Sequence, residues 1–527
     1  MISLNKSDIQ NILQRNSSLK DKLYSWGFLF TDSAIDESDY PFYGNWITEE
    51  LGQYKLIVYP NQTFYKCVQH DIFYLLIGHA YNPYSMCSDE NAILKEMCRY
   101  GFNSVGFWDL LNQLTGIFTL ICYVDGCLYL IGDATCMQTT FYSVKDSRTY
   151  ISTHTNLIAG YLDLKWSDYA TELCNYKFFK LLGNAMPGDI TTFDEVKRLV
   201  PNHYVCFTED KVVTHHRFFA PRNHNLSVAE AAEKSSIVLK NNLQLISKKW
   251  NRASISMTGG CDSKTTLSCA KSVYDKFDYF SYISSESEKV DAEAAHQICK
   301  SMNLPHSIYR ISESDSDFAD IEDIRKILRW NSGDILDNNS NDVRKRAFFM
   351  NVDDFDIEIK SWASEIGRAY YSKRFNGRKD FGEKPTPRKC TTMYKFFLNN
   401  RKLVKQTDMV FEQYLNGFFE QAKDHPVDWQ EQFFWEYRVP SWNGLVITGE
   451  HRFSFDITIP YNNRLLLEIL LSVPIEDRIS DTVYKEIRKQ QNPLVDKTGI
   501  AVTNLKHTKN REKAESIYYS VHSRIDF

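Results

Sequence analysis

The chain has 527 residues, of which 43% are hydrophobic and 24% charged, a composition that excludes wholesale disorder. Its 62 Lys and Arg residues against 67 Asp and Glu residues leave a formal net charge of -5, so no overall basic field attracts nucleic acid, and none is expected as a partner. At roughly 100–200 residues per domain, the length allows more than one domain, each with its own core.

The cysteines and the apolar segments indicate the compartment. The 12 cysteines form no Cys-x-x-Cys pair and no His and Cys cluster at zinc spacing, which excludes a zinc ribbon and favours reduced thiols. The polar N-terminus lacks the apolar core of a signal peptide. The longest apolar stretch, 114–124, has about 11 residues, whereas a membrane-spanning helix needs roughly 20. We therefore expect a cytoplasmic protein with no membrane partner.

Residues 1–215 predict a mixed α+β domain with antiparallel sheets. Segments rich in β-branched and aromatic residues alternate there with turn residues, a pattern typical of strands. Asp125-Gly126 supplies the positive φ angles of a tight hairpin turn. The expected strands are 53–59, 72–77, 116–124 and 127–132, and the expected helices are 89–100 and 168–182.

The period becomes helical after Pro221, and residues 221–527 predict an α/β domain with a helical extension. Ser227 and Glu230 form a capping-box pattern that begins a helix ending near residue 249. Strands and helices then alternate with short connections, as in a parallel sheet with crossover helices. The expected strands are 253–257 and 277–283, and the expected helices begin at 263, cover 290–302 and cover 465–473.

A basic segment at 372–405 carries 11 Lys and Arg residues and only two acids. One interpretation is a solvated loop, whose charges are screened by salt. The other is a mobile loop in which Arg374, Arg378 and Lys379 close over phosphates or an anionic substrate. The sequence leaves both open.

The octet at 256–263 lies between a predicted strand and a predicted helix. Gly259 and Gly260 allow a tight turn and close approach of a ligand. The first amides of the following helix form a positive end that binds phosphate, and Asp262 supplies a hard oxygen ligand for Mg²⁺. The spacing is not that of a Walker loop, and an ordinary glycine turn is the alternative. The predicted ATP and pyrophosphate contacts here are Ser256, Met257, Thr258, Gly259, Gly260, Asp262 and Ser263.

The octet resembles the S-G-G-x-D-S pyrophosphate-binding loop of the asparagine synthetase family, which includes the β-lactam synthetases. Its T-G-G-x-D-S form is similar to the loop found in ligases of polysaccharide and peptide gene clusters. The resemblance covers nearly the whole chain and implies a PP-loop ATP pyrophosphatase domain at 221–527 that uses ATP and Mg²⁺. The segments that resemble later family motifs are 284–302, 360–370, 435–438 and 459–466.

In the third of the family motifs, 360–370, Trp362 and Ala363 stand where the family has glycines, and Glu365 is the only acid. The resemblance implies Asp262 and Glu365 as metal ligands. It also implies Ile283 and Ser364 as nucleotide contacts, in addition to the octet.

The resemblance implies an amide-forming ligase. A substrate carboxylate attacks the α-phosphorus of ATP to give an acyl-adenylate, which an amine or ammonia then attacks. Lys485 is expected to stabilise the charge that develops, with a surface lysine as the alternative. Glu436 or Tyr437 is expected to act as the base toward the amine, and Glu436 is equally compatible with a buried ion pair to Arg438.

Residues 1–215 resemble the glutamine amidotransferase-like domain of the same family, which implies an Ntn-type sandwich of antiparallel sheets. An active glutaminase of this class uses an N-terminal Cys, whose thiol is the nucleophile and whose α-amine is the base. The sequence starts Met1-Ile2-Ser3, and its first cysteine is Cys67. We therefore expect a domain that does not release ammonia from glutamine.

Three alternatives stay open beside the amide-forming ligase. They are a glutamine-hydrolysing asparagine synthetase, an ATP-binding scaffold or regulator without catalysis, and a sulfur-transfer or tRNA-modifying enzyme. The expected partners are a small-molecule carboxylate and an amine, and a homodimer is left open.

Overall fold

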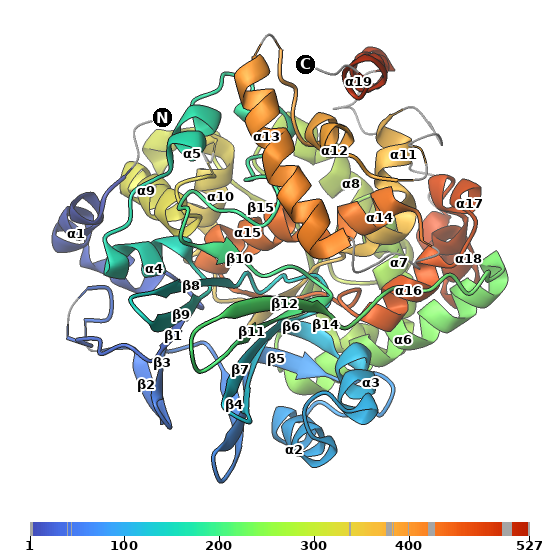
Figure 1. Ribbon diagram of the computed structural model, residues 1–527. Helices are drawn as coiled ribbons and strands as arrows, with labels where there is room; N and C mark the ends of the chain where they lie inside the picture. The colour runs from blue at the N-terminus through green and yellow to red at the C-terminus, as the bar shows by residue number, and fades with distance from the viewer. Residues whose placement is uncertain are drawn as a thin grey trace.

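The computed structural model describes residues 4–38, 40–43, 45–336, 339–375, 382, 384–398, 400–419, 427–497 and 509–524. It contains two six-stranded antiparallel sheets from the N-terminal half and one five-stranded parallel sheet from the C-terminal half. The antiparallel strands lie together in the lower part of Figure 1, with the C-terminal helices above them. Within these ranges, no helix is both long enough and apolar enough to cross a bilayer.

The two antiparallel sheets pack face to face. The first has the order β10-β8-β9-β1-β3-β2 and the second β12-β11-β7-β6-β5-β4. One core cluster joins Phe30 and Val58 of the first sheet to Phe73 and Leu130 of the second. The strands are β1 Phe28–Thr31, β2 Ile47–Leu51, β3 Tyr54–Val58, β4 Phe64–Gln69, β5 Ile72–Tyr81, β6 Thr115–Val124, β7 Cys127–Gly132, β8 Phe141–Lys145, β9 Arg148–Ser152, β10 Lys197–Arg198, β11 His203–Phe207 and β12 Val213–Arg217.

The predictions for the N-terminal half are largely confirmed. Strands β6 and β7 form the expected hairpin, with Val124 opposite Cys127, and Asp125 and Gly126 have φ angles of 51° and 76°. The predicted helix at 168–182 is instead a short helix followed by a 3₁₀ turn at Phe179–Leu182. The helices of this half are α1 Lys6–Arg15, α2 Glu90–Tyr100, α3 Val105–Gln113, α4 Thr155–Leu162 and α5 Asp168–Cys174.

The third sheet is parallel throughout and has the order β15-β14-β13-β16-β17. Strands β14 and β15 follow β13 on one side, and the later strands β16 and β17 lie on the other side of β13. The strand order therefore reverses between β13 and β16, and ligands bind beyond the carboxyl ends of strands at such a switch point. The strands are β13 Ala253–Ser256, β14 Phe277–Ile283, β15 Ser307–Arg310, β16 Ile357–Ile359 and β17 Asp456–Thr458.

Helices cover the parallel sheet and extend beyond it. Ser227 and Glu230 form the predicted capping box at the start of α6. Between α13 and α15, π-helical turns occupy Leu415–Phe419, Phe434–Arg438 and Pro440–Gly444. The helices are α6 Val228–Lys249, α7 Cys261–Cys269, α8 Glu286–Ser301, α9 Ile321–Asn331, α10 Ser340–Phe349, α11 Tyr370–Arg374, α12 Pro387–Tyr394, α13 Arg401–Tyr414, α14 Trp429–Phe433, α15 Leu445–Gly449, α16 Arg464–Leu471, α17 Ile475–Ile479, α18 Thr482–Gln491 and α19 Lys509–His522.

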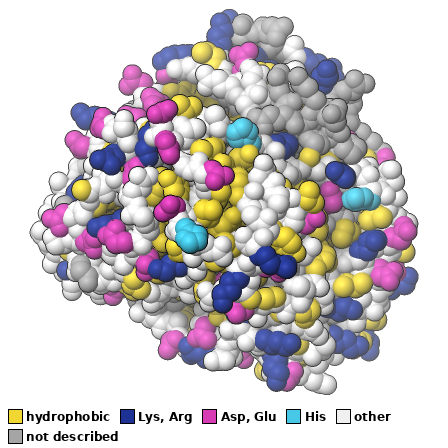
Figure 2. Space-filling view, turned by 60° about the horizontal axis from the view of Figure 1, so that its bottom comes forward, with side chains coloured by type: hydrophobic (Ala, Val, Ile, Leu, Met, Phe, Trp, Pro, Cys, Tyr) yellow, Lys and Arg dark blue, Asp and Glu magenta, His cyan; other side chains and the backbone are white. Residues whose placement is uncertain are grey.

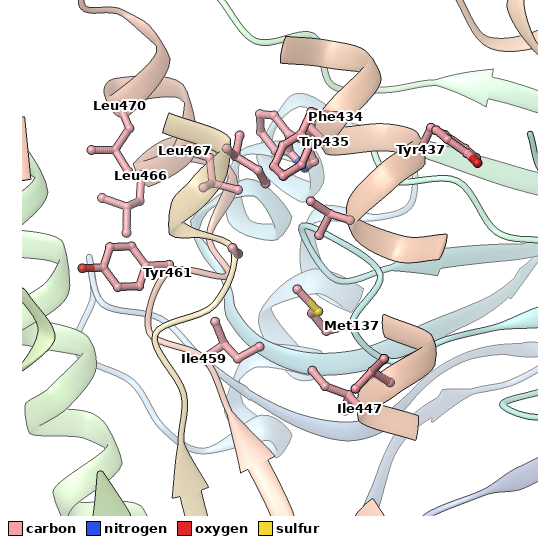
Figure 3. Packing of buried hydrophobic residues seen from close by; sticks show 14 of the residues in the cluster. Met137, Phe434, Trp435, Tyr437, Ile447, Ile459, Tyr461, Leu466, Leu467 and Leu470 are labelled. Atoms are coloured by element: carbon pink, nitrogen blue, oxygen red, sulfur yellow. The ribbon is translucent and has the colours of Figure 1, made fainter. Parts of the chain in front are cut away.

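A single large core joins the two halves. Figure 3 shows Met137 of the N-terminal half among Ile447, Ile459 and Trp435 of the C-terminal half. The indole nitrogen of Trp435 donates to the carbonyl of Ala134 at 2.8 Å. The last strand of the sandwich, β12, ends two residues beyond the proposed 1–215 unit, and the boundary near residue 220 stays a prediction.

Most of the basic segment at 372–405 that is described belongs to helices. Arg388 pairs with Asp408, and Lys402 pairs with Glu172 at 2.5 Å. Arg378 and Lys379 lie outside the described residues. On the face that Figure 2 shows, Lys and Arg side chains are interspersed with Asp and Glu, so this face carries no extended patch of one sign.

Candidate functional site: a cavity at the switch point of the parallel sheet

The predicted phosphate loop lies where the sequence places it, between strand β13 and helix α7. Helix α7 begins at Cys261 after Gly260, and no side chain caps it. The first amides of a helix have no intrahelical partner, and here no side chain accepts from them either, so they form a positive end. The backbone of Gly260 has φ -73° and ψ 165°, so a positive φ is not what requires glycine at this position.

Hydroxyl groups brace the loop from inside. The Ser263 hydroxyl donates to the Thr258 carbonyl at 2.9 Å and lies 3.0 Å from the Thr258 hydroxyl. The Gly260 amide donates to the Thr258 hydroxyl at 3.1 Å. The Thr and Ser residues at these offsets therefore hold the shape of the loop, in addition to any contact with a ligand.

The segment after β16 closes over the same loop. The Ser361 hydroxyl lies 2.7 Å from that of Thr266 in helix α7. The buried Ser364 hydroxyl donates to the Asp262 carboxylate at 2.7 Å. The third motif of the sequence thus lies across the switch point from the octet. Ala363, which stands where the family has a glycine, has φ 67°, a left-handed conformation that glycine adopts more easily.

A cavity of about 390 Å³ opens between these segments, within the usual range for small-molecule sites. The loop forms one wall, the end of β14 and the start of α8 form a second, and the segment after β16 forms a third. The lining residues are Ser256, Met257, Thr258, Asp262, Ser263, Phe280, Ser281, Tyr282, Glu288, Asp291, Ala292, Lys360, Ser361, Trp362, Glu365 and His451.

The wall formed by the third motif is aromatic and cationic. The Trp362 ring meets the His451 ring edge to face, with centroids 5.2 Å apart. The Lys360 ammonium lies 5.3 Å from the centre of the Trp362 ring and pairs with Glu358 at 2.7 Å. A flat aromatic ring beside a positive charge can pack against a nucleotide base or another planar group.

Asp262 lies at one end of an ion-pair chain. Arg368 donates to Asp262 at 2.6 Å and, through two nitrogens, to Asp481 at 2.9 and 3.0 Å. Lys373 also pairs with Asp481, at 2.5 Å. Burial by itself would raise the pKa of Asp481, but these two cations lower it below the ordinary value. The chain of charges fastens the loop to the start of helix α18.

Glu365 lines the cavity near Asp262. Burial, with the negative charge of Asp262, raises the pKa of Glu365 to about 7. A bound cation would stabilise the ionised form of Glu365 beside Asp262. Proteins hold Mg²⁺ through one or two carboxylates completed by substrate phosphates, so the donor set of Asp262 and Glu365 fits this ion. In the described part of the chain, no cluster of three or more His, Cys, Asp or Glu side chains forms a metal site by itself.

Several predicted site residues lie outside the lining of the cavity: the nucleotide contacts Gly259, Gly260, Ile283 and Ser364, and the catalytic candidate Lys485. Ile283 ends strand β14, and its carbonyl accepts from the Ile311 amide at 2.9 Å. Lys485 is exposed on helix α18 and donates to the Ser480 carbonyl at 2.8 Å. This position corresponds to the surface-lysine alternative, and the cation beside Asp262 is Arg368.

Glu436 and Tyr437 lie in the core between the two halves, and neither lines the cavity. Glu436 is fully buried and pairs with Arg217 at 2.6 Å, so its ion-pair partner is Arg217 and the alternative of Arg438 is wrong. Burial alone would raise the pKa of Glu436, but the charge of Arg217 lowers it. The Tyr437 hydroxyl donates to the Met186 carbonyl at 3.4 Å. A base role for either residue stays a prediction.

Sequence reasoning does not single out three residues that shape this site: Lys360, Arg368 and Lys373. Lys360 and Arg368 bracket Glu365 within the third motif, so their spacing around the expected acid is the available signal. Lys373 stands at the start of the basic segment, where nothing local places it next to Asp481, 108 residues further along.

No family model and no curated protein matches the chain. The solved structures that match include glutamine phosphoribosylpyrophosphate amidotransferase from B. subtilis complexed with ADP and GMP, at 8% identity over 57% of this chain and 62% of that chain, with a TM-score of 0.23. The match therefore spans less than two thirds of that protein. A glutamine-dependent NAD+ synthetase from Acinetobacter baumannii in complex with ADP matches at 11% identity over 32% and 33% of the chains, with a TM-score of 0.18. NMN synthetase from Francisella tularensis matches at 13% identity over 53% and 99%, with a TM-score of 0.17.

Proposed function

We propose that this chain is an ATP-dependent, AMP-forming ligase, similar to the asparagine synthetase family, that joins a small-molecule carboxylate to an amine or ammonia. The observation that carries the proposal is the cavity at the switch point of the parallel sheet. It brings together the start of helix α7, the Asp262 carboxylate and the third motif, although Asp262 and Ser364 are 102 residues apart in the sequence.

Different residues of the cavity are proposed to bind the phosphates and the adenine of ATP. The uncapped amides of helix α7 face the phosphates, and the braced Thr258 and Ser263 keep those amides in place. The Trp362 ring packs against the adenine. Lys360, the only lysine or arginine among the described lining residues, places a positive charge where the α-phosphate gains charge.

In the first reaction, a carboxylate oxygen of the substrate forms a bond to the α-phosphorus, and the bond from that phosphorus to the β-phosphate oxygen breaks, releasing pyrophosphate. In the second, the amine nitrogen bonds to the acyl carbon, AMP leaves, and the amine proton passes to a base. Mg²⁺ held by Asp262 and Glu365 would neutralise phosphate charge. Arg368, which now pairs with Asp262, is placed to bind a phosphate oxygen once that carboxylate has another partner.

A carboxylate-dependent exchange of radioactive pyrophosphate into ATP tests the first reaction. We expect one class of carboxylate to support exchange, and Asp262→Asn to abolish it while the circular dichroism spectrum is unchanged. Glu486→Gln is the matched control, because Glu486 lies on helix α18 outside the cavity, where its carboxylate accepts from Lys489 and Gln490. Full exchange in Asp262→Asn would refute the loop assignment.

A second candidate is an ATP-binding scaffold or regulator without catalysis. The favouring observation is that both oxygens of Asp262 are engaged, one by Ser364 and the other by Arg368. Calorimetric binding of ATP without exchange for any carboxylate would support this candidate. Exchange with any carboxylate would exclude it.

A further inference from the structure

A second, much smaller cavity lies where the helical extension meets the N-terminal half. Its volume is about 10 Å³, close to what one water-sized species requires. Helix α11, the π-helical turn Phe434–Arg438, helix α12 and the backbone after the 3₁₀ turn Phe179–Leu182 enclose it. The lining residues are Leu182, Gly183, Ala185, Tyr370, Tyr371, Arg374, Met393, Tyr394, Tyr437 and Arg438.

Positive charge is in excess around this cavity. Arg374 pairs with Glu515 at 3.0 Å. Arg438 has no carboxylate within ion-pair distance in the described ranges, and its guanidinium lies over the Trp442 ring, 5.1 Å from the ring centre. Fully buried Lys395 stands behind the wall, where its ammonium donates to the carbonyls of Phe179 and Gly183.

The groups near the cavity respond to this excess. Burial lowers the pKa of Lys395 well below its ordinary value, and the charge of Arg438 adds to the effect. Burial alone would raise the pKa of Tyr370, but the charges of Arg374 and Arg438 lower it. The Tyr370 oxygen accepts from Arg374 at 2.5 Å, so its own proton is left to be donated. Charges removed from water are normally paired, and of these two partly buried guanidinium groups only that of Arg374 has a carboxylate partner in the described ranges.

We propose that this cavity binds one small monovalent anion, of the size of chloride, between Arg374, Arg438 and the Tyr370 hydroxyl. All three groups are donors, and the surrounding Tyr371, Tyr394 and Tyr437 side chains are buried, which strengthens each contact.

Glycine at position 183 keeps the wall close to the anion. Gly183 has φ 92°, and a Cβ atom there would lie 3.0 Å from an Arg438 nitrogen and 2.9 Å from the Trp442 ring. A side chain would displace the guanidinium from the cavity. The volume of about 10 Å³ selects against anions much larger than chloride.

The test uses thermal unfolding of the full chain at constant ionic strength, with chloride replaced stepwise by gluconate, which is too large to enter. We expect chloride to raise Tm by about 1–3 °C and to saturate, as a single site requires. Arg438→Gln should lose this rise. Arg388→Gln should keep it, because Arg388 pairs with Asp408 outside the cavity. Equal Tm of the natural protein in chloride and gluconate would overturn the proposal.

A second measurement does not depend on any variant folding. Crystals of the unaltered protein grown in bromide should show an anomalous scattering peak between Arg374 and Arg438. A well-ordered cavity without that peak would overturn the proposal. A peak at this place that disappears in gluconate would establish the site.

Discussion

Glu436→Gln separates a structural role of this carboxylate from a role as the base toward the amine. Glu436 is fully buried, and it accepts from Arg217 at 2.6 and 2.8 Å and from Asn202 and Gln432 at 3.1 Å each. Glutamine keeps the shape but removes the charge, which leaves the Arg217 guanidinium buried without its counter-charge. Breaking a buried pair in this way costs about 3–5 kcal/mol.

The size of the expected change in Tm follows from the length of the chain. An unfolding entropy of about 2.1 cal/mol/K per residue corresponds to about 1.1 kcal/mol/K for the whole chain unfolding as one unit. The loss in Glu436→Gln therefore lowers Tm by about 3–5 °C. Scanning calorimetry measures this, with Glu486→Gln as the control, because the Glu486 side chain is partly exposed and far less buried than that of Glu436. The double variant Arg217→Met with Glu436→Gln should recover part of the loss, because it removes both charges.

The catalytic alternative predicts a different pattern. If Glu436 acts only in the structure, amine-dependent release of AMP continues in Glu436→Gln well below its Tm. An unchanged Tm together with a loss of amine-dependent AMP release would refute the structural reasoning and would establish Glu436 as a base.

Three further predictions concern single side chains. Trp362→Ala should raise the Kd for ATP in calorimetry by about tenfold, because an aromatic contact contributes about 0.5–1.5 kcal/mol beyond its buried area. Trp362→Phe should keep most of the affinity. Equal affinity in Trp362→Ala would show that the adenine does not pack against Trp362. Lys485→Ala should leave the rate of pyrophosphate exchange within about twofold of the natural rate, since each tenfold change requires about 1.4 kcal/mol and this lysine is exposed. A large loss of exchange would indicate that Lys485 acts in catalysis. Burial raises the pKa of Glu431 to about 7, above its ordinary value. The folded state therefore keeps this proton up to a higher pH than the unfolded state does. The free energy of unfolding should fall as pH rises from about 4.5 to 7. Glu431→Gln should show a smaller fall in Tm across that window, and parallel curves for the two proteins would contradict the assignment.

Local patterns in the sequence predict the features that neighbouring residues control. The hairpin at Asp125-Gly126 and the capping box of Ser227 and Glu230 depend on contacts within four residues, so their residue types are sufficient evidence. The alternation of strand and helix after residue 250 indicates a parallel sheet for the same reason, and it places the Gly259-Gly260 turn at the carboxyl end of a strand. Residue types and their order along the chain are therefore enough to locate the turn that is predicted to bind phosphate.

Contacts between distant parts of the chain are decided only by the tertiary structure. Glu436 meets Arg217 across 219 residues, and Arg368 meets Asp262 across 106. No local pattern distinguishes these partners from other arginines and acids, because ion pairing depends on distance in space and on exclusion of water, not on separation along the chain. The same holds for the small cavity beside Arg438, whose walls come from four segments that meet only when the two halves pack together.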